Sequence, residues 1–287
     1  MRLKLLCALL SLAASAVLAG EPSELEKELL AANGSLTIAD TVGNDPVVYR
    51  AMLGWAAANK NIEIKLEQTT LLDVTEKTGG KTYDLVIYQY DPSSKYELQP
   101  EGESSDYAIE AALVFVNAAC PLDDIQVGDL NAVFCGDLAD WLKLTAKPYS
   151  LHRYGVVHPA AGERAFRRRA MGQVGYTDSM MSVATTPEVV AGVSGSEYGI
   201  GFGGFPVMLP QEVKALKVNG ISPSPEHLRD HTYPLMLVRA AAVRPGGSPL
   251  AGLFVRLLRS PEVGLLASAE NLFPAAEEEM KQDEKKR

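Results

Sequence analysis

The first part of the chain alternates between two hydrophobic periods. Residues 35–39 and 62–66 carry apolar side chains at every second position, which predicts two β-strands. Between them, Asp45 and Pro46 stand where a helix N-cap and first helical residue are expected, and helical spacing continues to about residue 58. The order strand, helix, strand predicts the start of a parallel α/β sheet.

The middle of the chain predicts another strand and helix. Residues 111–116 form an uninterrupted apolar run that ends at Asn117, and a turn containing Pro121 follows. Residues 125–134 then carry apolar side chains at the spacing of a short amphipathic helix. Gly136 stands where a glycine commonly ends a helix.

The remaining elements follow from the same patterns. Residues 91–106 are polar and rich in turn-forming residues, which predicts a loop. A strand-like stretch, a loop and a helix are expected over residues 150–170. The other predicted strands cover residues 83–88, 199–205, 213–218 and 233–239, and the other predicted helices cover residues 21–32, 187–193, 250–258 and 261–267.

Composition narrows the class of protein. The chain has 287 residues, of which 47% are hydrophobic, enough for a well-packed core and for two lobes. Its formal net charge of -9 argues against a nucleic-acid partner, which would favour a basic surface.

The N-terminus has the features of a secretory signal peptide. Arg2 and Lys4 precede an uncharged apolar run over residues 5–18, and small residues at Ala19 and Gly20 offer a cleavage site. The run is too short for an ordinary transmembrane helix, although an uncleaved membrane anchor stays open as an alternative. We therefore expect residues 1–19 to be a signal peptide, the protein to be periplasmic or secreted, and residues 276–287 to be a charged tail.

Two cysteines remain after that cleavage, Cys120 and Cys135, and they flank the predicted helix of residues 125–134. Because an exported chain meets oxidising conditions, we predict a disulfide between them. Two buried free thiols are the alternative. No Cys or His spacing suggests zinc.

No catalytic site is predicted. The glycines of residues 199–205 have the wrong spacing for a dinucleotide fingerprint, and no helix follows them. No Ser/His/Asp or metal-ligating arrangement is found, so we expect no enzyme activity, no metal and no cofactor. The four histidines are scattered, at His152, His158, His227 and His231.

Several of these segments resemble extracytoplasmic solute-binding proteins of the phosphate-binding family, which serve ABC transporters. The similarity lies in Asn117, Pro121, residues 133–136 and 140–141, the glycine-rich strand of residues 199–205, and the Tyr-Pro-Leu of residues 233–235. The resemblance implies a two-lobed, periplasmic-binding-protein type II-like α/β fold, with mixed sheets flanked by helices and two hinge crossings. It places lobe 1 at residues 33–112 plus 240–275 and lobe 2 at residues 113–239.

The resemblance also implies where a ligand would bind. Asp40 and Thr41 match the family's first anion-binding turn, and Gln89 falls where phosphate binders place an acid. Aligning Gly155 and Phe166 with the family puts Val156 at the position of the anion-gripping Arg and residues 160–162 at Ser-Gly-Thr. His158 and Arg164 are the side chains available to compensate. The candidate ligand-binding residues are thus Asp40, Thr41, Gln89, His158, Ala161, Gly162 and Arg164.

Two functions stay open at this point. In the first, the protein is a monomeric solute-binding subunit that binds phosphate or another small anion in an interlobe cleft, without chemistry, and delivers it to an ABC transporter permease. In the second, the binding-protein fold has lost phosphate binding and recognises another ligand or a protein of the cell envelope. The missing Arg and hydroxyl groups favour the second hypothesis, because they would be needed to bind phosphate. The resemblance in fold favours the first hypothesis, because it indicates the family of solute-binding proteins.

Overall fold

The computed structural model describes residues 22–76, 82–205 and 208–275. The expected signal peptide and the charged tail lie outside the described residues. Among the described helices, none has the length and apolar character needed to cross a membrane.

The chain divides into two compact units. Unit 1 contains the described residues up to Ala108, Val238–Glu270 and those from Pro274; unit 2 contains Ile109–Leu237 and Asn271–Phe273. The chain passes between the units within strands β4 (Glu103–Ala111) and β12 (Met236–Val243), and again around the short strand β13 (Phe273–Pro274).

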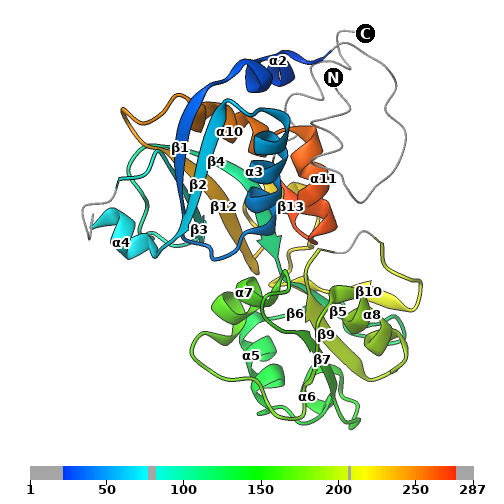
Figure 1. The fold of residues 1–287 in the computed structure, drawn as a ribbon. Helices are drawn as coiled ribbons and strands as arrows, with labels where there is room; N and C mark the ends of the chain where they lie inside the picture. Colours follow the sequence, from blue (N-terminus) through cyan, green and yellow to red (C-terminus); the bar gives the residue numbers. More distant parts are fainter. Residues whose placement is uncertain (1–21, 77–81, 206–207, 276–287) are drawn as a thin grey trace. The chain divides into compact units, whose positions relative to one another are not determined.

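A mixed six-stranded sheet forms the centre of unit 1 (Figure 1). Its strand order is β13-β4-β12-β3-β1-β2, where β1 is Gly34–Asp40, β2 is Ile62–Gln68 and β3 is Leu85–Tyr90. Strand β1 pairs in parallel with β2 and β3, whereas β12 runs antiparallel to β3. The predicted parallel start of the sheet is therefore confirmed.

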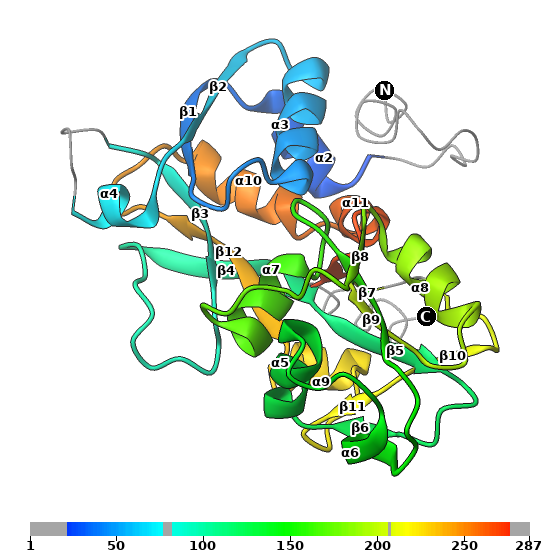
Figure 2. The same cartoon turned by 90° about the horizontal axis from the view of Figure 1, so that it is seen from below.

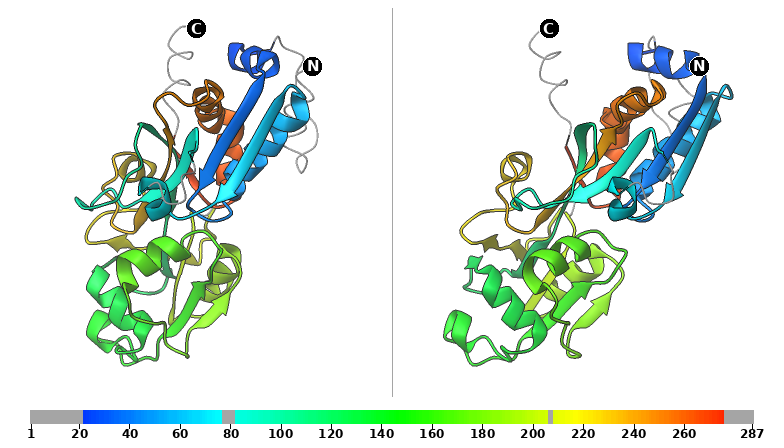
Figure 3. Two further views of the ribbon diagram at one scale, coloured as in Figure 1. Left: turned by 60° about the vertical axis from the view of Figure 1, so that its left-hand side comes forward. Right: turned by 90° about the vertical axis from the view of Figure 1, so that its left-hand side faces the viewer.

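Helices α3 (Pro46–Ala58), α10 (Leu250–Leu258) and α11 (Pro261–Ala269) pack together beside this sheet, with α2 (Glu24–Ala31) against α10 (Figure 2, Figure 3). Trp55 of α3 stacks on Phe254 of α10 at 6.0 Å between ring centroids. The Trp55 indole also donates to the Leu29 carbonyl of α2 at 2.9 Å. Asp45 and Pro46 begin α3 as predicted, and Ser260 caps α11.

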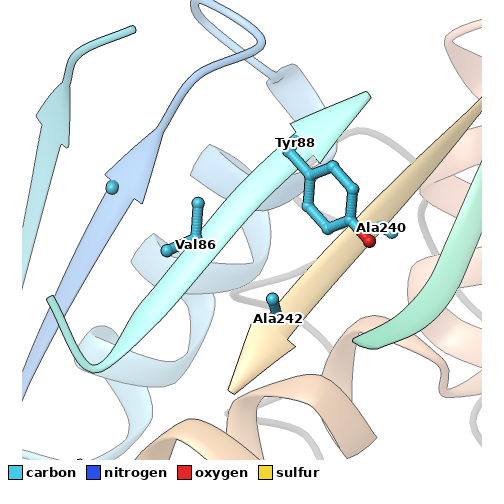
Figure 4. Packing of buried hydrophobic residues seen from close by; sticks show 5 residues of the cluster. Val86, Tyr88, Ala240 and Ala242 are labelled. Atoms are coloured by element: carbon cyan, nitrogen blue, oxygen red, sulfur yellow. The ribbon is translucent and has the colours of Figure 1, made fainter. Parts of the chain in front are cut away.

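The other face of the sheet carries a second apolar cluster, formed by Ala39, Val86, Tyr88, Ala240 and Ala242 (Figure 4). Tyr88 pairs across strands with Ala240, whose small side chain leaves room for the ring. The Tyr88 hydroxyl then reaches Ser104 of β4 at 3.0 Å. The short helix α4 (Leu71–Thr75) packs its partly buried side chains on this cluster.

Unit 2 is built on a five-stranded mixed sheet in the order β10-β5-β9-β7-β8, and these strands are labelled in Figure 2. Helix α8 (Thr186–Ser194) packs along β9, and α7 (Glu163–Phe166) continues into a π-helical turn, Arg167–Met171. The other elements are β5 (Leu113–Asn117), β7 (His152–Val156), β8 (Met181–Val183), β9 (Gly199–Gly203), β10 (Val213–Ala215), the small sheet of β6 (Asp124–Ile125) and β11 (Lys217–Val218), and helices α5 (Val127–Cys135), α6 (Leu142–Thr145) and α9 (Pro225–Arg229).

Three sequence predictions need correction. The apolar run of residues 111–116 is not one strand, because β4 ends at Ala111 and Ala112 donates its N–H to the Leu235 carbonyl before β5 begins. Residues 103–106, predicted as loop, begin β4, where the Ser104 and Asp106 side chains accept hydrogen bonds from Tyr88 and Tyr90. The single strand predicted over residues 213–218 is split between β10 and β11.

The predicted disulfide is also wrong: Cys120 and Cys135 are both free thiols. Cys120 is buried in the turn after β5, and Cys135 is the last residue of α5. Cys135 ends the nine-residue helix α5, about 12 Å from the start of that helix, whereas Cys120 lies in the turn after β5, seven residues before the helix begins. Flanking a helix in sequence therefore did not bring the two sulfur atoms together.

Candidate functional site

In unit 1, the candidate residues Asp40 and Thr41 lie at the carboxyl end of β1, where parallel α/β sheets commonly place ligand sites. The Asp40 carboxylate is buried and accepts three backbone N–H groups, from Val42 at 2.9 Å, Gly43 at 3.1 Å and Asp45 at 3.3 Å. These bonds fold the turn between β1 and α3. Asp40 therefore shapes the turn by using both of its carboxylate oxygens on the backbone.

Thr41 is tied to the neighbouring strand. Its backbone N–H and its hydroxyl both donate to the Ile87 carbonyl of β3, at 3.0 and 2.9 Å. A hydroxyl has one hydrogen to donate, so this hydroxyl cannot also donate to an anion while the bond to Ile87 is kept. Gln89, two residues further along β3, is half-buried and lies opposite Arg239 of β12 in the sheet register.

A buried carboxylate already occupies the N-terminus of α3. One oxygen of Asp45 accepts the N–H groups of Val47 at 2.9 Å and Val48 at 3.2 Å. Its second oxygen accepts from the Tyr107 hydroxyl at 2.6 Å and from the Arg239 guanidinium at 2.9 Å. The positive end of a helix favours one negative charge, and here the chain supplies that charge itself.

The partners of Asp45 are buried with it. Arg239 is 5% exposed and Tyr107 is 2% exposed. Burial, followed by the neighbouring Asp45 charge, raises the pKa of Tyr107 well above its ordinary value. The phenol therefore stays protonated and remains a donor to Asp45. The sequence predicted the cap but not these partners, since Tyr107 and Arg239 are distant in the chain and neither belongs to a motif.

In unit 2, the loop after β7 contains His158, Ala161 and Gly162, and α7 begins at Glu163. His158 is exposed and precedes Pro159 through a cis peptide bond. Val156, which stands at the family's Arg position, is completely buried. The side chains of this loop thus supply one imidazole in solvent and otherwise alkyl groups.

Gly162 is held tightly in place before α7. Its φ of +90° is left-handed, and a Cβ there would lie 2.6 Å from the backbone of Gly203 and Gly204. Its N–H donates to the buried Glu110 carboxylate at 3.2 Å. As at α3, a carboxylate of the chain itself lies at the start of the helix. The glycine-rich strand thus allows two backbone segments to pack closely.

An aromatic cluster fixes α7 on the sheet of unit 2. Phe166 of α7 stacks on Phe202 of β9 at 3.8 Å with nearly parallel rings. Phe134 of α5 meets both rings edge-on, at 5.0 and 5.1 Å. Core packing therefore positions the start of this helix on the sheet.

The arginines of α7 and the following turn have separate partners. Arg164 is half-buried on the first turn of the helix. Arg167 pairs with Glu163 at 2.7 Å and covers the Tyr176 ring, and the hydrogen bond with Glu163 raises the pKa of Arg167. Arg169 donates to the Pro234 carbonyl at 2.7 Å. These cations serve different contacts rather than one pocket.

The most buried cation among the described residues of unit 2 was not predicted from the sequence. Arg153 of β7 is 4% exposed and donates to the Val133 carbonyl at 2.6 Å, and also to the carbonyls of Leu138 and Leu151 and to Ser179. Burial lowers the pKa of this guanidinium. It ties β7 to the end of α5. Within the described residues no cluster of His, Cys, Asp and Glu could hold a metal ion.

The sequence has a curated relative but matches no protein-family model. The phosphate-binding protein PstS of Bacillus subtilis (strain 168) is 22% identical over 273 residues, covering 90% of this chain and 88% of that protein. The similarity thus extends along nearly the whole of both chains.

Solved structures share the architecture. A possible phosphate binding protein from Planctomyces limnophilus gives a TM-score of 0.71 at 14% identity, covering 88% of this chain and 97% of that one. An ABC-type phosphate transport receptor from Vibrio cholerae gives 0.65 at 12%, covering 84% and 99%. PstS from Borrelia burgdorferi gives 0.62 at 12%, covering 84% and 98%.

The fold is that of the phosphate-binding proteins. The predicted fold class, an α/β chain of periplasmic-binding-protein type II-like architecture with mixed sheets flanked by helices, is confirmed, and so is the resemblance on which it was based. At 12–14% identity, these structures establish the fold alone and leave the ligand of this chain open.

Proposed function

We propose that this protein is an extracytoplasmic solute-binding protein that binds a small ligand without chemistry and delivers it to the permease of an ABC-type importer. The observation that carries the proposal is the similarity to a phosphate-binding protein over 90% of the chain, in a fold shared with a phosphate transport receptor. The expected signal peptide supports export, and residues 1–19 would be absent from the mature protein.

Phosphate is the first candidate ligand, because the relatives that share this fold are named for phosphate. Under this proposal the candidate contact residues are Asp40, Thr41 and Gln89 in unit 1 and His158, Ala161, Gly162 and Arg164 in unit 2. An anion at either helix start would have to compete with the carboxylate already there, Asp45 at α3 or Glu110 at α7.

A different ligand, or a protein partner in the envelope, is the second candidate. The specific observation that favours it is that the α3 N-terminus and the Gly162 N–H already have internal carboxylate partners. Val156 also leaves the loop without the guanidinium that would grip an anion. An oxyanion that loses such a charge-assisted contact loses about 1.5–3 kcal/mol of binding free energy.

Calorimetric titration of the exported protein with phosphate, sulfate, molybdate and small organic anions separates the two candidates. Micromolar phosphate binding that weakens at least tenfold in Thr41→Ala, but not in the exposed control Thr82→Ala, supports the first. Absence of heat with every anion, together with specific binding of an envelope protein, supports the second. Recovery of the protein only from the cytoplasm, with a chain that still begins at Met1, would contradict export.

A further inference from the structure

The carboxylate of Asp45 has more hydrogen-bond donors around it than a helix cap requires. An N-cap side chain ordinarily accepts from one or two N–H groups of its own helix, as Asp45 does from Val47 and Val48. Its second oxygen also accepts from two buried side chains, the Tyr107 hydroxyl at 2.6 Å and the Arg239 guanidinium at 2.9 Å. Four donors among the described residues therefore surround one carboxylate, as they would surround a bound anion.

The fold of unit 1 brings these donors together from three elements. Val47 and Val48 lie in the first turn of α3, whereas Tyr107 lies on β4 and Arg239 on β12. Strands β4 and β12 are neighbours in the sheet (Figure 1). Because side chains alternate along a strand, Arg239 points away from the cluster that contains Ala240 and toward the start of α3. The donor set is therefore a product of the tertiary structure and not of a local motif.

Charge and geometry make this set of donors selective for an anion. All four donor residues are buried. The Arg239 guanidinium carries a full positive charge, and the N-terminus of the 13-residue helix α3 adds the partial positive charge of the helix dipole. A carboxylate has about four lone-pair positions, so it can accept from all four donors at once. A small carboxylate or another small oxyanion is thus the class of ligand that fits.

The turn that precedes α3 is held by a different carboxylate. Asp40 accepts the N–H groups of Val42, Gly43 and Asp45, and none of these belongs to the four donors around the Asp45 carboxylate. Glycine is also an accepted residue at the N-cap position. Removing the Asp45 side chain should therefore preserve the turn and the donors and take away only the anion.

We propose that Asp45 is a tethered anion that determines the ligand specificity of unit 1: its carboxylate fills a site for a small carboxylate or oxyanion and keeps free anions away from the start of α3. A carboxylate attached to the chain loses no translational or rotational freedom on binding, so a free anion competes poorly with it. The site itself does not depend on the proposed function. Its consequence for the solute does, because an anionic solute must then bind through other groups.

Chemical rescue of Asp45→Gly with formate tests the proposal. The substitution removes the carboxylate and its methylene group, and formate is small enough to take their place. Urea unfolding of the full exported chain, followed by circular dichroism, measures the equilibrium constant of unfolding. We expect about 0.2 M formate to lower this constant about tenfold relative to the same concentration of sodium chloride, as a dissociation constant of about 20 mM requires. A variant that is unfolded without formate should refold when formate is added, and a variant that formate neither stabilises nor refolds overturns the proposal.

Asp45→Asn is the matched control, because its amide removes the charge but still fills the space. Neither Asp45→Asn nor the natural protein should respond to formate beyond the effect of sodium chloride, and neutral formamide should not rescue Asp45→Gly. Adding Tyr107→Phe to Asp45→Gly removes one donor and should weaken formate binding about tenfold or more.

Two kinds of result contradict the assignment. A response to formate in Asp45→Asn or in the natural protein that equals the response of Asp45→Gly, or an equal rescue by formamide, would show a general solvent effect. Rescue that Tyr107→Phe leaves undiminished would place the formate elsewhere. None of these results depends on whether the natural protein binds phosphate, so failure here is distinct from failure of the proposed function.

Discussion

Asp45 joins several elements in the interior of unit 1. It caps α3 and forms a buried ion pair with Arg239. Replacing it by Asn keeps the shape and a cap oxygen but leaves the guanidinium buried without its counter-charge. We expect Asp45→Asn to lower the free energy of unfolding by about 3–5 kcal/mol, as for other broken buried pairs.

Urea denaturation of the purified protein measures this loss. The matched control is Asp123→Asn, which breaks the exposed ion pair with Lys214 and should change stability little. Equal effects of the two substitutions would mean that the buried pair has no special weight, and would also weaken the argument that Asp45 replaces a bound anion.

Asp84 gives unit 1 a predictable response to acid. Burial tends to raise its pKa, but the hydrogen bonds from the Thr37 hydroxyl, the Thr37 N–H and the Ser248 N–H outweigh burial and lower it. A carboxyl with a depressed folded-state pKa stabilises the fold above its unfolded-state pKa of about 3.9, and this contribution is lost as the pH falls through the folded value.

We therefore expect the stability difference between the natural protein and Asp84→Asn to be large at about pH 6 and to shrink steadily below about pH 4. Urea unfolding at several pH values measures it, with the exposed Asp137→Asn as control. A difference that is constant over this range would show that Asp84 acts through packing and that its charge is unimportant.

At the scale of elements, the start of α7 depends on one glycine. Gly162 needs a left-handed φ, and its missing Cβ lets the loop lie on the backbone of Gly203 and Gly204. Gly162→Ala should destabilise unit 2 by about 2–4 kcal/mol, through backbone strain and a clash that no side-chain rotation relieves.

Thermal and urea unfolding of Gly162→Ala test this expectation. Gly128→Ala is the control, because Gly128 lies in α5 with a negative φ and no atom within 4 Å of the added methyl. It should be neutral or stabilising by about 0.5–1 kcal/mol. If Gly162→Ala is equally well tolerated, the close packing of this loop is not what positions α7.

The sequence predicted elements well where one residue type dictates the local conformation. Asp45 with Pro46 placed the start of α3, and Gly136 placed the end of α5 in the left-handed conformation. It failed where long-range pairing decides, as for residues 103–106, which are polar yet begin β4, a strand that lies between β12 and β13 in the sheet.

The candidate site shows the same limit. The resemblance pointed to Asp40, Thr41 and Gly162 as candidates, but Ile87 and Glu110, which form hydrogen bonds with Thr41 and Gly162, come from strands distant in the sequence. The two cysteines show the converse: they are near each other in the sequence, yet they form no disulfide. The resemblance indicated which positions could contact a ligand. It could not indicate that other groups of this chain already form hydrogen bonds at those positions.

At the scale of the whole molecule, each unit has its own sheet and core, and each contains one of the two tryptophans. Trp55 is buried in α3 of unit 1, and Trp141 is buried at the start of α6 in unit 2, where its indole donates to the Tyr198 carbonyl at 3.0 Å. The variants Trp141→Phe and Trp55→Phe therefore leave one fluorescent reporter in unit 1 or in unit 2, respectively.

We expect a substitution to act mainly on the unit that contains it, because most of the free energy of folding comes from packing within a core. Asp45→Asn should lower the urea midpoint reported by Trp55 more than that reported by Trp141, and Gly162→Ala should do the opposite. The two single-tryptophan proteins without a further substitution provide the reference midpoints. Identical shifts of both reporters in both variants would mean that the units unfold as one cooperative body, and that a change in either core is felt by the entire chain.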